Sequence, residues 1–209
     1  MPRLKLAVLL SGNGTTLENL FEKSAVGALD ADIAVVVSSR ADAFGLERAR
    51  RRNVPAMTVA RKEFKNIDDF SAAVYAAIAP YKVDLICHAG FMCMLRVPPD
   101  YENRMVNVHP ALLPAFGGKG FYGHFVHEAV LKHGCKISGC TVHFVDNVYD
   151  NGPIIAQRAV PVFDTDTPEV LGARVQQAER ELYPEAIQVI AEGRIKIVNR
   201  VVVVCPKRS

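Results

Sequence analysis

The chain has 209 residues, and 50% of them are hydrophobic, so it can bury one full core and we expect a single domain. Its 25 Lys and Arg against 22 Asp and Glu give a formal net charge of +3, which does not favour nucleic-acid binding through bulk charge. The 5 cysteines are odd in number and lack close CxxC spacing, which argues against a disulfide framework or a zinc knuckle. The first apolar run is too short for a signal peptide or a spanning helix, so we expect a cytoplasmic protein.

Short apolar runs alternate with helical patterns through the first half of the chain. We expect strands at residues 6–10, 33–37, 56–59, 83–88 and 105–109. Helices are expected between them at residues 15–23, 43–52 and 67–79, the last stopped by Pro80. Residues 15–18 also have the form of a capping box. This order is typical of a mostly parallel sheet with helices on both faces.

The pattern changes after residue 109. Strands at 137–145 and 153–162 flank a polar turn, which predicts a hairpin added to the sheet, antiparallel at least in part. A long helix follows, capped by Asp166 or Thr167, with Pro168 in its first turn and a kink at Pro184. A last β run is expected at residues 195–204. The predicted class is α/β: a single-domain, doubly wound, mostly parallel sheet with a C-terminal antiparallel addition and a long late helix.

The first loop, residues 11–16, joins a strand to a helix. Its free amides and two hydroxyls can hold a phosphate at the positive end of the helix dipole. The loop lacks the Lys of a Walker motif, and Leu17 stands where the dinucleotide fingerprint has its third Gly. Arg40 leaves NADP open as a ligand, and a bare tight turn is the structural alternative.

Asn107 and His109 are two residues apart on an expected strand and therefore point to one face. Pro110 and Pro114 follow them and place the pair at a strand-to-loop corner, where α/β enzymes carry their chemistry. An imidazole that must be charged near neutral pH works best with a carboxylate that favours that form and orients the ring. Asp150 is our candidate, and an Asx turn at Asp150 is the structural alternative.

Histidines outside this corner are candidate metal ligands. His124 and His127 are three apart on an expected helix, but the sequence around them misses the zincin spacing, so we expect no metal. His88 and His143 lie in apolar strand runs and are interpreted as core histidines with satisfied hydrogen bonds.

Five segments carry a family resemblance: Ser11-Gly12-Asn13-Gly14, Ala89-Gly90-Phe91-Met92, Asn107-Val108-His109-Pro110 with Leu112-Leu113-Pro114, Gly139-Cys140-Thr141-Val142-His143-Phe144-Val145, and Asp150-Asn151-Gly152-Pro153. In this order and spacing, from about residue 6 to residue 197, the chain resembles the phosphoribosylglycinamide formyltransferase family and its Rossmann-like formyltransferase fold. The resemblance implies transfer of a formyl group from 10-formyltetrahydrofolate to the amino group of glycinamide ribonucleotide, in de novo purine (IMP) synthesis. The folate is a co-substrate, and no metal is implied.

The resemblance also implies roles for single residues. His109 would be the general acid and base, Asn107 would hold the formyl oxygen, and Asp150 would favour the charged form of His109. The ribonucleotide would bind to Asn13, Gly14, Thr15, Thr16, Gln176 and Glu179. The folate would bind to Met92, Cys93, Met94, Leu95, Asn107, Asp146, Asn147, Val148, Tyr149 and Asp150. The ribonucleotide half would cover about residues 1–100, and the folate and catalytic half about residues 101–209.

The sequence departs from the family's common form at two positions. Ile67 and Cys93 fall where many members carry Arg near the folate. Arg61, Lys62 or Lys65 replaces the contact expected at Ile67, or that contact is absent.

The Gly-rich segment at residues 115–122 follows the catalytic corner. We expect this segment to be a lid that excludes water, because water would hydrolyse the formyl donor.

Three alternatives share parts of the pattern. Formyltetrahydrofolate deformylase shares the Asn, His and Asp, but we expect it to carry an N-terminal regulatory domain. Methionyl-tRNA formyltransferase would need a C-terminal tRNA-binding domain, for which Lys207 and Arg208 are no substitute. A non-catalytic nucleotide-binding module would leave Asn107, His109 and Asp150 unexplained. The expected partners are therefore the two small substrates, with no nucleic acid and no membrane, in a monomer or homodimer.

Overall fold

The computed structural model describes residues 3–207, so Arg208 of the Lys207-Arg208 pair lies outside the described residues. The chain divides into two compact units, Met1–Val106 and Asn107–Ser209, which we call the N-terminal and C-terminal units. Strand β5 (Met105–His109) crosses the boundary between them. Each unit is described by itself.

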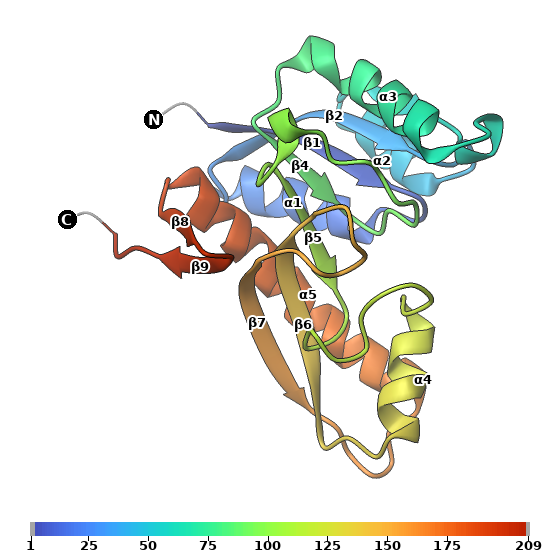
Figure 1. The fold of residues 1–209 in the computed structure, drawn as a ribbon, viewed down its shortest axis with the longest axis vertical. Helices are drawn as coiled ribbons and strands as arrows, with labels where there is room; N and C mark the ends of the chain where they lie inside the picture. Colours follow the sequence, from blue (N-terminus) through green and yellow to red (C-terminus); the bar gives the residue numbers. More distant parts are fainter. Residues whose placement is uncertain (1–2, 208–209) are drawn as a thin grey trace. The chain divides into compact units, whose positions relative to one another are not determined.

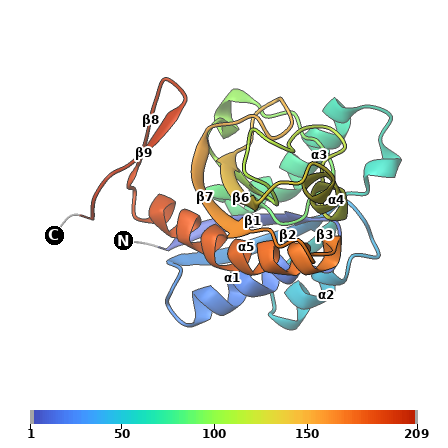
Figure 2. The same cartoon turned by 90° about the horizontal axis from the view of Figure 1, so that it is seen from below.

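The N-terminal unit is a parallel sheet in the strand order β3-β2-β1-β4. Its strands are β1 (Leu4–Leu10), β2 (Ala31–Ser38), β3 (Ala56–Thr58) and β4 (Leu85–His88). Helices α1 (Thr15–Ala25) and α2 (Phe44–Arg51) cover one face, and α3 (Ile67–Ile78) covers the other, as Figure 2 shows. Short 3₁₀ turns lie at Arg61–Glu63, Ala79–Tyr81 and Pro99–Tyr101. Strands buried on both faces need continuous apolar sequence, and residues 6–10 of β1 are fully buried and apolar.

The start of helix α1 differs from its prediction. Gly14, with φ of 71°, is the N-cap residue, and no side chain caps the helix, so the predicted capping box is wrong. Glu18 bonds instead to Arg48 of α2 and to Arg52, the residue that follows this helix. Two guanidinium partners compete better for this carboxylate than one backbone amide does. Helix α3 has the expected kind of cap, because Asn66 Oδ1 accepts from the amide of Asp69 at 2.8 Å.

The C-terminal unit is built on the strand order β5-β6-β7 and a long helix (Figure 1). Strands β6 (Ile137–Phe144) and β7 (Ile154–Pro161) pair antiparallel, as predicted. Helix α5 (Pro168–Ala191) packs on both strands and also contacts α4 (His124–Lys132). Thr167 caps α5 at the amide of Val170, whereas Asp166 pairs with Arg174. The helix continues through Pro184.

The chain's last β segment was predicted as one run and is two strands. β8 (Ile195–Val198) and β9 (Val201–Val204) pair antiparallel around Asn199 and Arg200. Both turn residues have positive φ, 46° and 74°, which is the geometry that favours tight hairpins. The turn was missed because Arg is an unusual residue at such a position. The predicted α/β class, with its mostly parallel sheet, late antiparallel pair and long late helix, is confirmed.

Candidate active site

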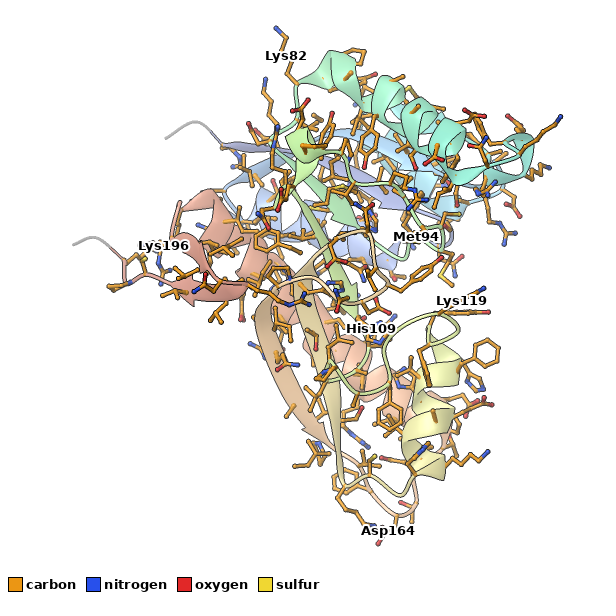
Figure 3. The ribbon with its side chains drawn as sticks, in the orientation of Figure 1. Lys82, Met94, His109, Lys119, Asp164 and Lys196 are labelled. Carbon is orange, nitrogen blue, oxygen red and sulfur yellow. The ribbon has the colours of Figure 1, made fainter. Side chains whose placement is uncertain are left out.

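The C-terminal unit holds a buried imidazole between two oxygen acceptors. His109 ends β5 and is 3% exposed (Figure 3). Its Nδ1 lies 3.5 Å from Oδ2 of Asp150, and its Nε2 lies 2.8 Å from the carbonyl oxygen of Phe116. Nε2 must carry a proton to donate to the Phe116 carbonyl, and Nδ1 faces the Asp150 carboxylate. The structure therefore brings the predicted base and its predicted carboxylate together.

Asn107 is oriented by a histidine that sequence reasoning placed only in the core. Its Nδ2 lies 3.2 Å from Nε2 of His143, and Nδ1 of His143 lies 2.8 Å from the carbonyl oxygen of Phe144. Burial lowers the pKa of His143, so this ring is neutral, donates from Nδ1 to the carbonyl and accepts from the Asn107 amide at Nε2. One N–H of Asn107 remains for a ligand. No local pattern in the sequence indicates this contact, because it depends on how two strands are placed.

The Asp150 carboxylate joins these two histidines. Its Oδ1 lies 3.8 Å from Nε2 of His143, and its Oδ2 accepts from the amide of Gly118 at 2.9 Å. Asp150 has a φ of 50°, a left-handed conformation that Asp tolerates better than most residues. The Asx turn belongs to Asp146, whose Oδ1 accepts from the amide of Val148 at 2.9 Å.

Gly152 is needed for packing. A Cβ at this position would lie 1.8 Å from the carbonyl oxygen of Phe144. Only glycine at position 152 therefore lets the loop that carries Asp150 pack against β6. This contact places Asp150 beside the histidines.

The corner after His109 is held by side chains of β6 and β7. Thr141 Oγ1 donates to the carbonyl of Ala111 at 2.7 Å and accepts from the amide of Leu113 at 3.0 Å. Gln157 Nε2 donates to the carbonyl of Leu113 and to Thr141. These bonds satisfy backbone groups that leave the strand, so the corner keeps a fixed geometry.

The segment at residues 115–122 contacts both catalytic candidates. The carbonyl oxygen of Phe116 accepts from His109, and the amide of Gly118 donates to Asp150. Figure 3 labels Lys119 on this segment, between β5 and α4. The lid role stays a prediction.

The first loop of the N-terminal unit has its carbonyl groups occupied and its amides free. The carbonyls of Gly12, Asn13 and Gly14 accept from Gly45 N, Arg48 Nε and Glu18 N at 3.1, 2.9 and 3.0 Å. Within residues 3–207, the amides from Gly12 to Thr16 donate to no protein acceptor. Gly12, Asn13 and Thr15 are exposed. Free amides at a helix N-terminus are suited to an anion.

Helix α2 fixes the shape of this loop. A Cβ on Gly14 would lie 2.6 Å from the Cα of Gly45, so two glycines let the helix and the loop touch. Arg48 bonds to the Asn13 carbonyl and, at 3.2 Å, to Glu18. Burial raises the pKa of Glu18, but the bonds from Arg52 and Arg48 outweigh burial and lower it. Glu18 is therefore charged and joins α1 to α2.

Gln176 and Glu179 lie three apart on α5, within the C-terminal unit. Gln176 is exposed, whereas Glu179 is half-buried. Burial raises the pKa of Glu179 to about 7. No described residue forms an ion pair or hydrogen bond with its carboxylate. Such a group is ready to accept hydrogen bonds from a ligand.

The predicted folate residues lie in two segments, one in each unit. In the N-terminal unit Met92 is 53% exposed and so is not core, whereas Leu95 is 1% exposed and belongs to the core. Ser11 Oγ accepts from the amide of Met92 at 2.9 Å and holds this segment. In the C-terminal unit, Val148 and Tyr149 are exposed by 58% and 44%. The folate role of these residues stays a prediction.

The remaining histidines show no metal geometry. Among residues 3–207, no three His, Cys, Asp or Glu side chains gather as metal ligands. His124 lies 2.8 Å from Glu128, and His127 is buried against Gly172 of α5. His88 is buried with its ring edge toward Phe91.

Comparison with known proteins decides the family. Residues 4–187 match the model of the formyl transferase family. The chain belongs to the phosphoribosylglycinamide formyltransferases. It is 40% identical over 197 residues to the chloroplastic phosphoribosylglycinamide formyltransferase of Arabidopsis thaliana, covering 93% of this chain and 68% of that protein. The crystal structure of glycinamide ribonucleotide transformylase 1 from Symbiobacterium toebii is similar with a TM-score of 0.91 and 42% identity, over 98% of this chain and 95% of that chain.

Two other relatives set limits on the comparison. The chain is 40% identical to a part of the trifunctional purine biosynthetic protein adenosine-3 of Gallus gallus, but that match spans only 19% of the longer protein. A formyltetrahydrofolate deformylase from Pseudomonas syringae has a TM-score of 0.86 at 23% identity, over 98% of this chain and 66% of that chain. That likeness shows a shared fold alone. The enzyme class, a folate-dependent formyltransferase, is confirmed by the family.

Proposed function

We propose that this chain transfers the formyl group of 10-formyltetrahydrofolate to the amino group of glycinamide ribonucleotide. The products are N-formylglycinamide ribonucleotide and tetrahydrofolate. The observation that carries the proposal is the convergence of Asn107 and Asp150 on the buried ring of His109 and its neighbour His143. An amide donor, a charged imidazole and a carboxylate are what attack by an amine on a formyl carbon requires.

The reaction joins the amine nitrogen to the formyl carbon and breaks the bond from that carbon to N10 of the folate. Negative charge develops on the formyl oxygen, and the free N–H of Asn107 donates to it. The amine loses a proton and N10 gains one, so His109 moves a proton between them. Asp150 stabilises the charged ring and holds its orientation. His143 accepts from one N–H of the Asn107 amide and so orients the second N–H for the formyl oxygen.

His109 must be uncovered before it can act. Its Nδ1 faces Asp150, which leaves Nε2 to meet substrate, and Nε2 is occupied by the Phe116 carbonyl. We infer that the segment at residues 115–122 withdraws to admit substrate and then closes against water. Hydrogen exchange checks this: both substrates together should change protection of residues 116–120, and equal exchange with and without them would contradict it.

The ribonucleotide binds through groups that have no partner among the described residues. Its phosphate accepts hydrogen bonds from the free backbone amides of the loop at Asn13, Gly14, Thr15 and Thr16. The ribose hydroxyls donate to Glu179, with Gln176 beside it on α5. The pterin binds mainly to backbone groups of residues 92–95 and 146–150.

The test is purified protein with 10-formyltetrahydrofolate, with and without glycinamide ribonucleotide, monitored for release of tetrahydrofolate. Release that depends on the amine supports the transferase. Release without the amine would identify a deformylase, and no release under either condition would leave only a binding module.

The proposed setting follows from these substrates. The chain acts on small molecules in the cytoplasm as a monomer or homodimer, without nucleic acid. Within residues 3–207, no helix is both long and apolar enough to cross a membrane.

A further inference from the structure

Two side chains of β6 hold the backbone and the amide on either side of His109. His143 bonds to the side chain of Asn107, two residues before His109. Thr141 bonds to the carbonyl of Ala111, two residues after His109. The first contact belongs to the proposed reaction, because it orients the amide that meets the formyl oxygen. The second contact depends on a residue of β7 that no step of that reaction uses.

The hydroxyl of Thr141 has its full hydrogen-bonding capacity in use. Its one hydrogen goes to the carbonyl oxygen of Ala111 at 2.7 Å, so its other two bonds must be accepted. The two donors are the amide of Leu113 and Nε2 of Gln157, each at 3.0 Å. Thr141 is 0% exposed, so water cannot replace a lost partner. An unpaired group at this depth is costly, which favours keeping every bond of the set.

Gln157 completes this set from the neighbouring strand. It lies directly opposite Thr141 in the antiparallel pair of β6 and β7. The residue is exposed, yet both N–H groups of its amide are used by the corner, one on Thr141 and one on the carbonyl of Leu113 at 2.9 Å. Ordering a long surface side chain costs conformational entropy, and water could satisfy the same amide. The benefit of this arrangement therefore lies in what it holds, which is Leu113 by both its N–H and its C=O.

Leu113 connects Gln157 with the groups around the imidazole. A Cβ on Gly117 would lie 2.5 Å from Cδ2 of Leu113, so the segment after the corner packs directly on this side chain. Phe116, the residue before that glycine, accepts from His109, and the residue after it donates to the carboxylate beside the ring. A displacement of Leu113 would therefore reach both neighbours of the imidazole.

We propose that Gln157 is a positioning residue for formyl transfer and acts on His109 through Leu113. It touches neither substrate in the proposed reaction. It holds the corner so that the ring keeps one orientation toward Asp150 and toward the proton that it moves. This inference rests on the proposed function.

The test measures kcat and both KM values for Gln157→Met, which keeps the length of the side chain and removes its donors. Gln157 is exposed, so the substitution leaves the core intact. We expect kcat to fall about tenfold, less than the roughly 10²-fold cost of a 1 Å misplacement, because Thr141 still holds Leu113 at its N–H. Both KM values should stay unchanged. Gln177→Met makes the same substitution at an exposed glutamine of α5 that bonds to Glu181 of its own helix, and it should keep full activity.

Thr141 supplies a second pair of variants for the same corner. Thr141→Val removes the hydroxyl at nearly constant shape and should lower kcat at least as much as Gln157→Met, because Leu113 and Ala111 both lose a partner. Thr141→Ser restores the hydroxyl and should recover most of kcat. Equal loss in the Val and Ser variants would indicate packing and would overturn the inference.

Two further readouts separate positioning of His109 from a general loosening of the fold. In a His109→Asn background, Gln157→Met should lower the residual rate no further, because its effect passes through the ring. The ¹⁵N signals of the His109 ring, recorded without ligands, should shift in Gln157→Met and stay in place in Gln177→Met.

Three results would each overturn the inference: full kcat in Gln157→Met, an equal further loss in the His109→Asn background, or ring signals that match those of the wild type. The ring signals need no turnover. A wild type that failed to transfer formyl groups would therefore contradict the proposed function, while these signals still decided whether Gln157 positions His109.

Discussion

The catalytic corner of the C-terminal unit and the first loop of the N-terminal unit are built in opposite ways. The corner depends on side chains, since Asn107, His109 and His143 each have a specific partner. The loop presents free backbone amides, and its carbonyls are held by α1 and α2. Replacing a side chain at the corner should therefore remove chemistry. Replacing a side chain of α2 that holds the loop should change the loop's shape, and so should alter substrate binding.

The largest effect is expected at His109. His109→Asn removes the proton carrier, so kcat should fall by about 10³-fold, within the usual range for general acid–base catalysis. KM for glycinamide ribonucleotide should change little in steady-state kinetics. His124→Asn, on the exposed side of α4, is the matched control and should keep full activity. A decrease in kcat of less than tenfold for His109→Asn would contradict the role of His109 as the proton carrier.

Asp150→Asn should lower kcat by about 10²-fold, because an amide cannot stabilise the charged imidazole. Asn tolerates the left-handed conformation at this position, so the fold should persist. The dissociation constants of both substrates, measured by titration, should remain within a few-fold. Asp164→Asn, at an exposed ion pair, serves as the control. Unchanged turnover in Asp150→Asn would refute the assignment.

Arg48→Met tests whether the shape of the first loop affects substrate binding. It frees the Asn13 carbonyl from its guanidinium partner, so KM for glycinamide ribonucleotide should rise about tenfold, the equivalent of one charged hydrogen bond, with kcat nearly unchanged. Arg51→Met removes the same charge from the same helix, where it pairs only with Glu47 and the ring of Phe44. If both variants raised KM equally, charge and not loop shape would be the cause.

The smallest effect concerns stability. Burial raises the pKa of Glu179 to about 7, so the folded carboxyl keeps its proton where the unfolded one has lost it. The free energy of unfolding should therefore fall as pH rises from about 4.5 to 7. Glu179→Gln should be more stable than the wild type by about 1 to 3 kcal/mol at pH 8 and equally stable at pH 4. Denaturant unfolding at both values measures this, and Glu181→Gln, on the exposed face, is the control. An equal difference at both pH values would contradict it.

Local sequence was enough to predict much of this architecture. Strand β5 was predicted with the bounds that the structure has, because apolar runs before Pro110 leave few alternatives. The pairing of β6 with β7 and the start of α5 followed from turn and cap residues. These features depend on neighbours in the chain, which a single sequence displays.

Features that depend on distant contacts were missed. Asn107 and His143 meet through strand placement, and no local pattern indicates that contact. The capping box failed because Arg48 and Arg52 come from another part of the chain. The close approach of Gly152 to Phe144 also joins segments that are apart in the chain.

The central claim is that the His109 corner passes a formyl group to an amine. The most direct measurement follows the label from 10-[¹⁴C]formyltetrahydrofolate in the presence of glycinamide ribonucleotide, for the wild type and His109→Asn side by side. We expect one labelled N-formyl product for each tetrahydrofolate released by the wild type, and almost none from the variant. Label appearing as free formate, or equal product from both proteins, would contradict the account.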